Sequence, residues 1–132
     1  MSTRATGTME LKSWEEQPFS EIDEGRKLTR AHVITAFQGE IEGEGTKEYL
    51  MVYHDDDSAG FVGLERVVGS VGGRSGSFVV QHDGTFEGGT ARAALSVVPG
   101  SGTGGLRGLR GEGEFVWPHG QPGSFTLDYD VE

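Results

Sequence analysis

The sequence predicts an all-β protein, a closed antiparallel barrel of about eight strands. Two observations carry this prediction. Polar and apolar residues alternate with period two through most of the 132 residues, as they do in half-buried strands. The 23 glycines are spread between the alternating segments, where tight turns, bulges and barrel corners require them. Successive hairpins without a helical crossover favour a meander, and its closure removes exposed strand edges.

The predicted strands are joined by short connections. They cover residues 5–14, 27–41, 47–54, 60–71, 74–82, 90–98, 106–116 and 123–131. In the first strand Met9 and Leu11 alternate with polar neighbours. An acidic stretch with Pro18 follows it, for which we expect a short helix or an irregular loop. The second strand is long enough to require a bend near Gln38–Gly39, and the third ends in the turn-rich cluster 55–60.

Glycine turns separate the later strands. The fourth stops before Gly72–Gly73, the fifth leads into Asp83–Gly84, and the sixth ends at Pro99–Gly102. The last two strands have the clearest alternation, with apolar residues at every second position. These residues are Leu109, Phe115 and Trp117 in the seventh strand and Phe125, Leu127, Tyr129 and Val131 in the eighth.

Length and composition predict a single β-barrel domain over residues 1–132. With 34% hydrophobic and 24% charged residues, the chain resembles neither a membrane protein nor a disordered tail. No apolar run approaches the roughly 20 residues that span a bilayer. Met1–Gly7 lacks the apolar segment of a signal peptide, and the chain has no cysteine for disulfides or thiolate ligands. We therefore expect a cytoplasmic protein.

The charge of the chain bears on its partners. Its net charge is -10, from 21 acidic and 11 basic residues. This balance repels phosphate backbones, and no basic stripe with interleaved aromatic residues offsets it. We therefore expect no binding to nucleic acid or to membranes.

Three short motifs resemble known sites, and each has a simpler interpretation. Gly100–Gly105 matches a dinucleotide-binding pattern, but the segment that follows, 106–111, contains too much glycine for a phosphate-binding helix. The cluster His54–Asp57 resembles a calcium loop, but Arg66 stands where its last ligand should be, which favours an acidic hairpin turn. Gly73–Ser77 only approaches a serine-nucleophile motif. We expect neither a metal site nor a cofactor.

Glu65 and His82 are the candidate catalytic residues. Glu65 shares a strand face with Phe61 and Val67, and His82 shares one with Phe78. If both faces point into the barrel, the two side chains form a buried acid–base pair on neighbouring strands. In the alternative, His82 belongs to a turn and Glu65 lies outside. It would then pair there with an arginine such as Arg66, Arg74 or Arg92.

Alternation leaves both interpretations open, because Val62, Leu64 and Val68 make the opposite face of the same strand apolar as well. A strand that is apolar on both sides has one face for the barrel interior and another for a partner. We therefore expect the outer face to meet another subunit in a homo-oligomer.

Several blocks follow one another along nearly the whole chain. They are Trp14–Phe19, Tyr49–Met51, Gly60–Arg66, Gly73–His82, Gly84–Phe86, Gly100–Gly104 and Leu109–Gly113. In sequence and order they resemble the bacterial domain-of-unknown-function family 3224. The resemblance implies a small closed β-barrel akin to allene oxide cyclase and dirigent proteins, often oligomeric. It supplies no established activity or catalytic residues, and fold alone does not transmit function.

Three functions are compatible with these observations. In the first, the barrel binds a small hydrophobic molecule in its lumen, lined by Trp14, Tyr53, Phe78 and Trp117 together with Glu65 and His82. In the second, it is a cofactor-free cyclase or isomerase that acts on an apolar substrate through Glu65 and His82. In the third, it is a structural or interaction protein with an inert lumen.

Overall fold

The structure, a computed structural model, describes residues 2–55 and 57–131, and its described residues form strands and turns only. The strands are β1 (Thr3–Asp23), β2 (Arg26–Gly39), β3 (Ile41–Tyr53), β4 (Ala59–Val71), β5 (Arg74–Glu87), β6 (Thr90–Val97), β7 (Thr103–Gly104), β8 (Leu109–Pro118) and β9 (Gly123–Val131). The prediction of an all-β fold is confirmed. Within these residues there is no helix long and apolar enough to cross a membrane.

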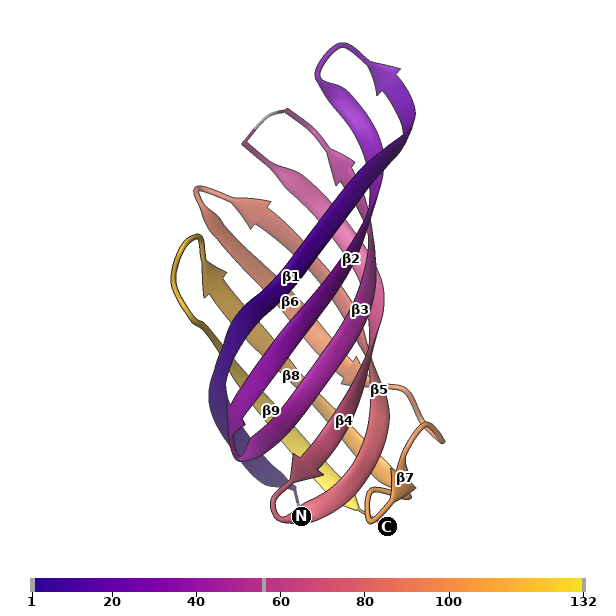
Figure 1. The fold of residues 1–132 in the computed structure, drawn as a ribbon, viewed down its shortest axis with the longest axis vertical. Coiled ribbons are helices and arrows are strands. Elements are labelled where there is room, and N and C mark those ends of the chain that lie inside the picture. Colours follow the sequence, from indigo (N-terminus) through magenta and orange to yellow (C-terminus); the bar gives the residue numbers. More distant parts are fainter. Residues whose placement is uncertain (1, 56, 132) are drawn as a thin grey trace.

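The strands form a closed ring in the order β4-β3-β2-β1-β9-β8-β6-β5, and a further pairing of β5 with β4 completes it. Each pairing around the ring is antiparallel. Figure 1 shows the strands running obliquely around the interior, as closure of a barrel requires. The two-residue strand β7, which alternation did not predict, pairs with the start of β5.

The acidic stretch after Trp14 is strand, so the expected helix or loop there was wrong. β1 continues to Asp23 and pairs with β2 from Gly7 to Asp23. Pro18 is tolerated because β1 has a second neighbour, β9, only as far as the pair Met9–Gly123. Beyond Met9 β1 is an edge strand. Proline is accepted in edge strands because the side without an N–H can face solvent instead of a neighbouring strand.

Other predicted boundaries also moved: the third strand begins at residue 41 instead of 47, the seventh covers 109–118 instead of 106–116, and two turns lie elsewhere than expected. The chain does not bend at Gln38–Gly39 but turns back there: β2 ends at Gly39, whose φ of 117° favours glycine, and β3 begins at Ile41. β5 does not turn at Asp83–Gly84, because Gly84 pairs with Phe61 on β4 and with Ala93 on β6. The turn comes later, at glycines 88 and 89, both with positive φ.

Both termini lie at the same end of the barrel (Figure 1), which we call the closed end. Apolar side chains pack its interior. Its buried residues include Met9, Phe37, Val67, Phe78, Leu109 and Phe125. The rings of Phe37 and Phe125 meet edge to face with centroids 5.7 Å apart. The opposite end, from which the β1–β2 hairpin projects, we call the open end.

The outer face of β3 and β4 carries exposed apolar side chains. Val62, Leu64 and Val68 are 48%, 53% and 49% exposed, while their neighbours Glu65 and Val67 are buried. Leu50 on β3 lies opposite Val62 and is also exposed. The strand is therefore apolar on both faces, and Glu65 is on the inner one.

Candidate functional site

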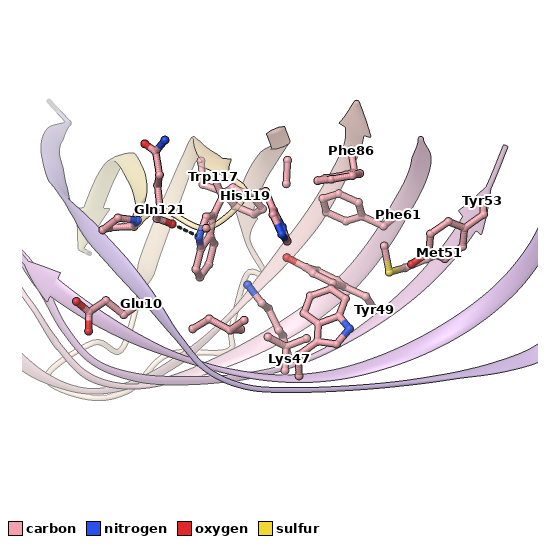
Figure 2. A pocket seen from close by; sticks show the side chains of 17 residues that line it. Glu10, Lys47, Tyr49, Met51, Tyr53, Phe61, Phe86, Trp117, His119 and Gln121 are labelled. Atoms are coloured by element: carbon pink, nitrogen blue, oxygen red, sulfur yellow. Dashed lines mark hydrogen bonds between the residues drawn. The ribbon is translucent and has the colours of Figure 1, made fainter. Parts of the chain in front are cut away.

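A cavity of about 730 Å³ occupies the open end of the barrel (Figure 2). Its walls are mainly aromatic and include Trp14, Tyr49, Tyr53, Phe61, Phe86 and Trp117. These side chains come from β1, β3, β4, β5 and β8, so the cavity is lined from most sides of the ring.

The cavity opens where β1 extends beyond its neighbour. Gly123, which pairs with Met9, is the first residue of β9, so past Met9 the strand β1 faces the β8–β9 turn. Glu10, Leu11 and the turn residues 119–122 line the cavity on the two sides of this opening. Leu11 is 52% exposed, so the lining continues to the molecular surface.

A β-bulge turns Trp14 toward the cavity. Leu11 pairs with Thr35, but Ser13 pairs with Ile34, so one extra residue is inserted in β1. This shift places Trp14 opposite Val33, whose side chain is buried inside the barrel. Without the bulge, strict alternation from the inward-facing Met9 would direct Trp14 to the outside of the barrel.

Lys47 enters the cavity from its floor. Its side chain, on β3, is only 2% exposed. Its Nζ lies 5.1 Å from the ring centroid of Tyr49, 5.4 Å from that of Phe115 and 5.3 Å from that of Trp117. Burial lowers the pKa of Lys47, and the nearby charge of Glu65 opposes this shift. Figure 2 shows Nζ between the Trp117 and Tyr49 side chains, directed into the cavity.

Next to Lys47, three buried side chains form a hydrogen-bonded chain. His82 Nε2 lies 2.9 Å from Glu65 Oε1, and His82 Nδ1 lies 3.0 Å from the Tyr49 hydroxyl. Glu65 and His82 are each 1% exposed. Register explains the meeting: Glu65 lies opposite Lys47, and Gly63 lies between Tyr49 on one neighbouring strand and His82 on the other.

Gly63 makes room for this chain. A Cβ at this position would overlap the backbone oxygen of Glu48 and lie 2.5 Å from Cδ1 of Tyr49, closer than real side chains approach. A larger residue would therefore displace the β3 backbone and the Tyr49 ring that meets His82. Gly45 has the same role beside Glu65, because a Cβ there would overlap its carboxylate.

The protonation states follow from the electrostatics. Burial alone would raise the pKa of Glu65, but the charge of Lys47 and the hydrogen bond from His82 outweigh it and lower the pKa. Burial also lowers the pKa of His82, which is therefore neutral near pH 7. His82 Nε2–H donates to the Glu65 carboxylate, and His82 Nδ1 accepts from the Tyr49 hydroxyl. Burial raises the pKa of Tyr49 well above its usual value, so the hydroxyl keeps its proton.

A second polar cluster lies at the rim. Glu16 on β1 accepts hydrogen bonds from Thr29, from the Tyr53 hydroxyl and from the indole N–H of Trp14. Partial burial opposes its ionisation, but these bonds outweigh it and lower its pKa. The cluster holds two aromatic walls of the cavity in place.

The residues predicted to form the site separate into two groups. Trp14, Tyr53 and Trp117 line the large cavity. Glu65 and His82 form the predicted buried pair, and with Phe78 they line a much smaller space of about 20 Å³ toward the closed end. Phe78 precedes His82 by four residues on β5, a strand that starts at the closed end, and this places Phe78 below the large cavity.

The sequence reasoning missed Lys47 and Tyr49. On β3, Lys47, Tyr49 and Met51 occupy alternate positions and are all buried. A lysine that alternates with two apolar residues on the same strand face is the sequence signal that would have identified Lys47 as buried. The meeting of Tyr49 with His82 depends on register, which alternation does not supply.

The acidic cluster after β3 forms a hairpin turn. Asp55 accepts hydrogen bonds from the backbone N–H of Asp57 and from the Ser58 hydroxyl. Asp56, which belongs to the predicted turn, lies outside the described residues. In the described part of the chain, no three histidine, aspartate or glutamate side chains are grouped so as to hold a metal ion.

Comparisons with known proteins agree with the fold. A solved structure of a protein of unknown function from the DUF3224 family of Shewanella oneidensis MR-1 is 32% identical to this chain. The alignment covers 100% of this chain and 99% of that one, with a TM-score of 0.78. No curated protein matches the chain. The family model described as "Protein of unknown function (DUF3224)" matches residues 5–129. The chain belongs to the DUF3224 family.

Proposed function

We propose that the protein binds a small, mainly apolar molecule in the open end of its barrel. The observation that carries this proposal is the cavity of about 730 Å³ with aromatic walls. Pockets that bind small molecules typically measure about 300–1,000 Å³ and combine apolar walls with a few polar groups. The closed end of the same barrel leaves only about 20 Å³.

The two tryptophans of the chain, Trp14 and Trp117, both line the cavity, so intrinsic fluorescence reports on it directly. We expect the neutral fluorophore N-phenyl-1-naphthylamine to bind, with energy transfer from tryptophan to the probe. Ala91 lines the cavity, whereas Ala94 on the same strand is exposed. Ala91→Trp, which fills part of the cavity, should weaken binding of the probe about tenfold. This corresponds to a loss of about 1.4 kcal/mol of binding free energy.

Ala94→Trp is the matched control and should leave the affinity of the probe unchanged. Equal binding by the wild type and both variants would place the probe outside the cavity and contradict the proposal. Native mass spectrometry of protein purified from its own host would then test for a retained small molecule.

A second candidate function is a cofactor-free isomerase or cyclase, and the chain from Glu65 through His82 to Tyr49 favours it. The Tyr49 oxygen would take a proton from a substrate carbon next to a carbonyl while its own proton passes to His82. The electron pair stays on the substrate as an enolate, which recovers the proton at the same or another carbon. Glu65 stabilises the imidazolium formed in between.

Deuterium exchange into the carbon next to the carbonyl of 2-propionylnaphthalene, followed by NMR in D₂O, tests this activity. Glu65→Gln and His82→Asn should each slow the exchange about 100-fold or more, the range typical of general acid–base groups. Asp83→Asn, at the exposed neighbour of His82, should not change it. Exchange at the uncatalysed rate in the wild type would remove this candidate.

The third candidate, self-association, is supported by the outer face of β3 and β4. Leu50, Val62, Leu64 and Val68 are all exposed there. Paired across a two-fold axis, two such faces would bury apolar surface on both copies. Light scattering should give an oligomer for the wild type and a smaller species for Leu64→Glu. A monomeric wild type would rule this out.

A further inference from the structure

We infer that the bound molecule is neutral and carries a carbonyl oxygen that accepts a hydrogen bond from Lys47. This inference rests on the proposed binding function and specifies the class of its ligand. It starts from Lys47, a buried donor that faces the cavity and lacks an acceptor.

Lys47 has N–H donors to satisfy and no acceptor capacity as an ammonium. Lys47 as a residue is only 2% exposed and lines the cavity, and in the part of the chain that the structure describes its Nζ makes no hydrogen bond or ion pair. Buried polar groups are nearly always hydrogen-bonded, and an unmet donor is unfavourable. An acceptor atom on a molecule in the cavity would satisfy it.

The surroundings of Nζ limit where that acceptor can be. The ring centroids of Tyr49, Phe115 and Trp117 lie 5.1–5.4 Å from the nitrogen, and the Tyr49 hydroxyl, which is bonded to His82, makes no hydrogen bond with it. Glu65 is the cross-strand neighbour of Lys47. Its Oε1 is bonded to His82, and its Oε2 has no hydrogen-bond partner and forms no ion pair with Nζ. The approach left open is from the cavity, toward which the Lys47 side chain is directed (Figure 2).

The charges around the cavity favour a neutral molecule. The Glu65 carboxylate already balances the charge of Lys47 in the buried part of the site. Glu10 lines the cavity, Glu16 lies at its rim, and the chain carries a net charge of -10. A carboxylate ligand would add an uncompensated charge to a buried, acidic environment, which is unfavourable. A carbonyl offers the acceptor without the charge.

The remaining walls define the rest of the molecule. Met51, Phe61, Phe86 and Ala91 surround the space above Lys47 and present only apolar atoms. The expected ligand is therefore a hydrocarbon or aromatic body with a ketone, aldehyde or ester oxygen at its inner end.

Three probes with one aromatic body test this assignment: 2-propionylnaphthalene, 2-propylnaphthalene and 2-naphthoate, each displacing N-phenyl-1-naphthylamine. In the wild type the ketone should bind about tenfold more tightly than the alkyl compound, as expected for a hydrogen bond to a charged group. In Lys47→Met this preference should disappear, while the alkyl compound binds as before. The naphthoate should bind more weakly than the ketone.

Lys47→Met leaves Glu65 without its compensating charge, so Lys47→Met/Glu65→Gln serves as a second variant that keeps the site neutral. A measurement on the wild type alone adds an independent readout. The infrared stretch of a ¹³C-labelled carbonyl should lie at lower wavenumber when the ketone is bound than when it is dissolved in hexane.

The outcomes separate the two proposals. If the ketone and the alkyl compound bind equally well and the carbonyl stretch matches that in hexane, the role of Lys47 is overturned but binding in the lumen stands. If the naphthoate binds most tightly, the ligand class is anionic and the inference is wrong. If none of the three probes nor the fluorophore binds, the proposed function itself fails.

Discussion

The closed end and the open end of the barrel are built from the same strands but differ in what fills them. At the closed end, side chains such as Met9, Phe37 and Phe125 leave about 20 Å³ unfilled. At the open end the cavity measures about 730 Å³, although its walls are equally aromatic. The difference lies in the pairing of β1, which has β9 as a neighbour only up to Met9.

This comparison teaches that the filled and the unfilled parts of the interior coincide with a change in the pairing of β1. Where β1 is paired on both sides, apolar side chains fill the interior. Where it becomes an edge strand, the large cavity lies beside it. The four polar side chains Lys47, Tyr49, Glu65 and His82 lie at the boundary between the two regions, buried like the closed end but next to the cavity.

The largest expected effect compares one phenylalanine from each end. Phe125 is 3% exposed and packs in the closed end, so Phe125→Ala should lower the free energy of unfolding by about 3–5 kcal/mol. Phe86 lines the cavity and is only half-buried, so Phe86→Ala should lower it by about 1 kcal/mol, near the typical effect of a single substitution. Urea unfolding measures both, and equal losses would contradict the distinction between the two ends.

The second largest expected effect concerns the boundary between the closed end and the open end of the barrel. Gly63→Ala should lower the free energy of unfolding by about 1–3 kcal/mol, because its Cβ would overlap the Glu48 backbone oxygen and lie 2.5 Å from Cδ1 of Tyr49. Gly60→Ala on the same strand is the control, since the nearest atom to its Cβ, His54 Nε2, is 3.9 Å away. Chemical denaturation of the two variants should separate them clearly. A Gly63→Ala protein as stable as Gly60→Ala would mean that Tyr49 and His82 are not packed as described.

The smallest effect is a pH dependence. The pKa of His82 is lowered in the folded state by burial, so below about pH 6.5 the unfolded chain binds a proton that the folded chain resists. Stability should therefore fall as the pH decreases from 7 to 5, by at most about 1.4 kcal/mol per pH unit for this one group. In His82→Asn the slope of the unfolding free energy against pH should be smaller. An unchanged slope would show that His82 is protonated in the fold or accessible to water.

The period-two alternation and the glycine turns predicted the eight strands of the ring, but not all of their bounds and not β7. β4, β6 and β9 lie within a residue of their predicted bounds, because their inward and outward residues alternate without interruption. β1 was underestimated because its outer half is an edge strand with acidic residues and Pro18, a composition that local propensity assigns to loops. The bulge between Leu11 and Ser13 likewise leaves no local signal, yet it sends Trp14 into the cavity.

The sequence by itself determined that the chain forms antiparallel strands and that Glu65 and His82 lie on apolar faces. Only the tertiary structure decided which face of β4 is inside, because Val62 and Leu64 make its other face equally apolar and closure of the ring settles the choice. The tertiary structure also placed Lys47 and Tyr49 next to the Glu65–His82 pair. Their meeting depends on the register of three strands that are paired through non-local hydrogen bonds, and periodicity along one strand cannot encode that register.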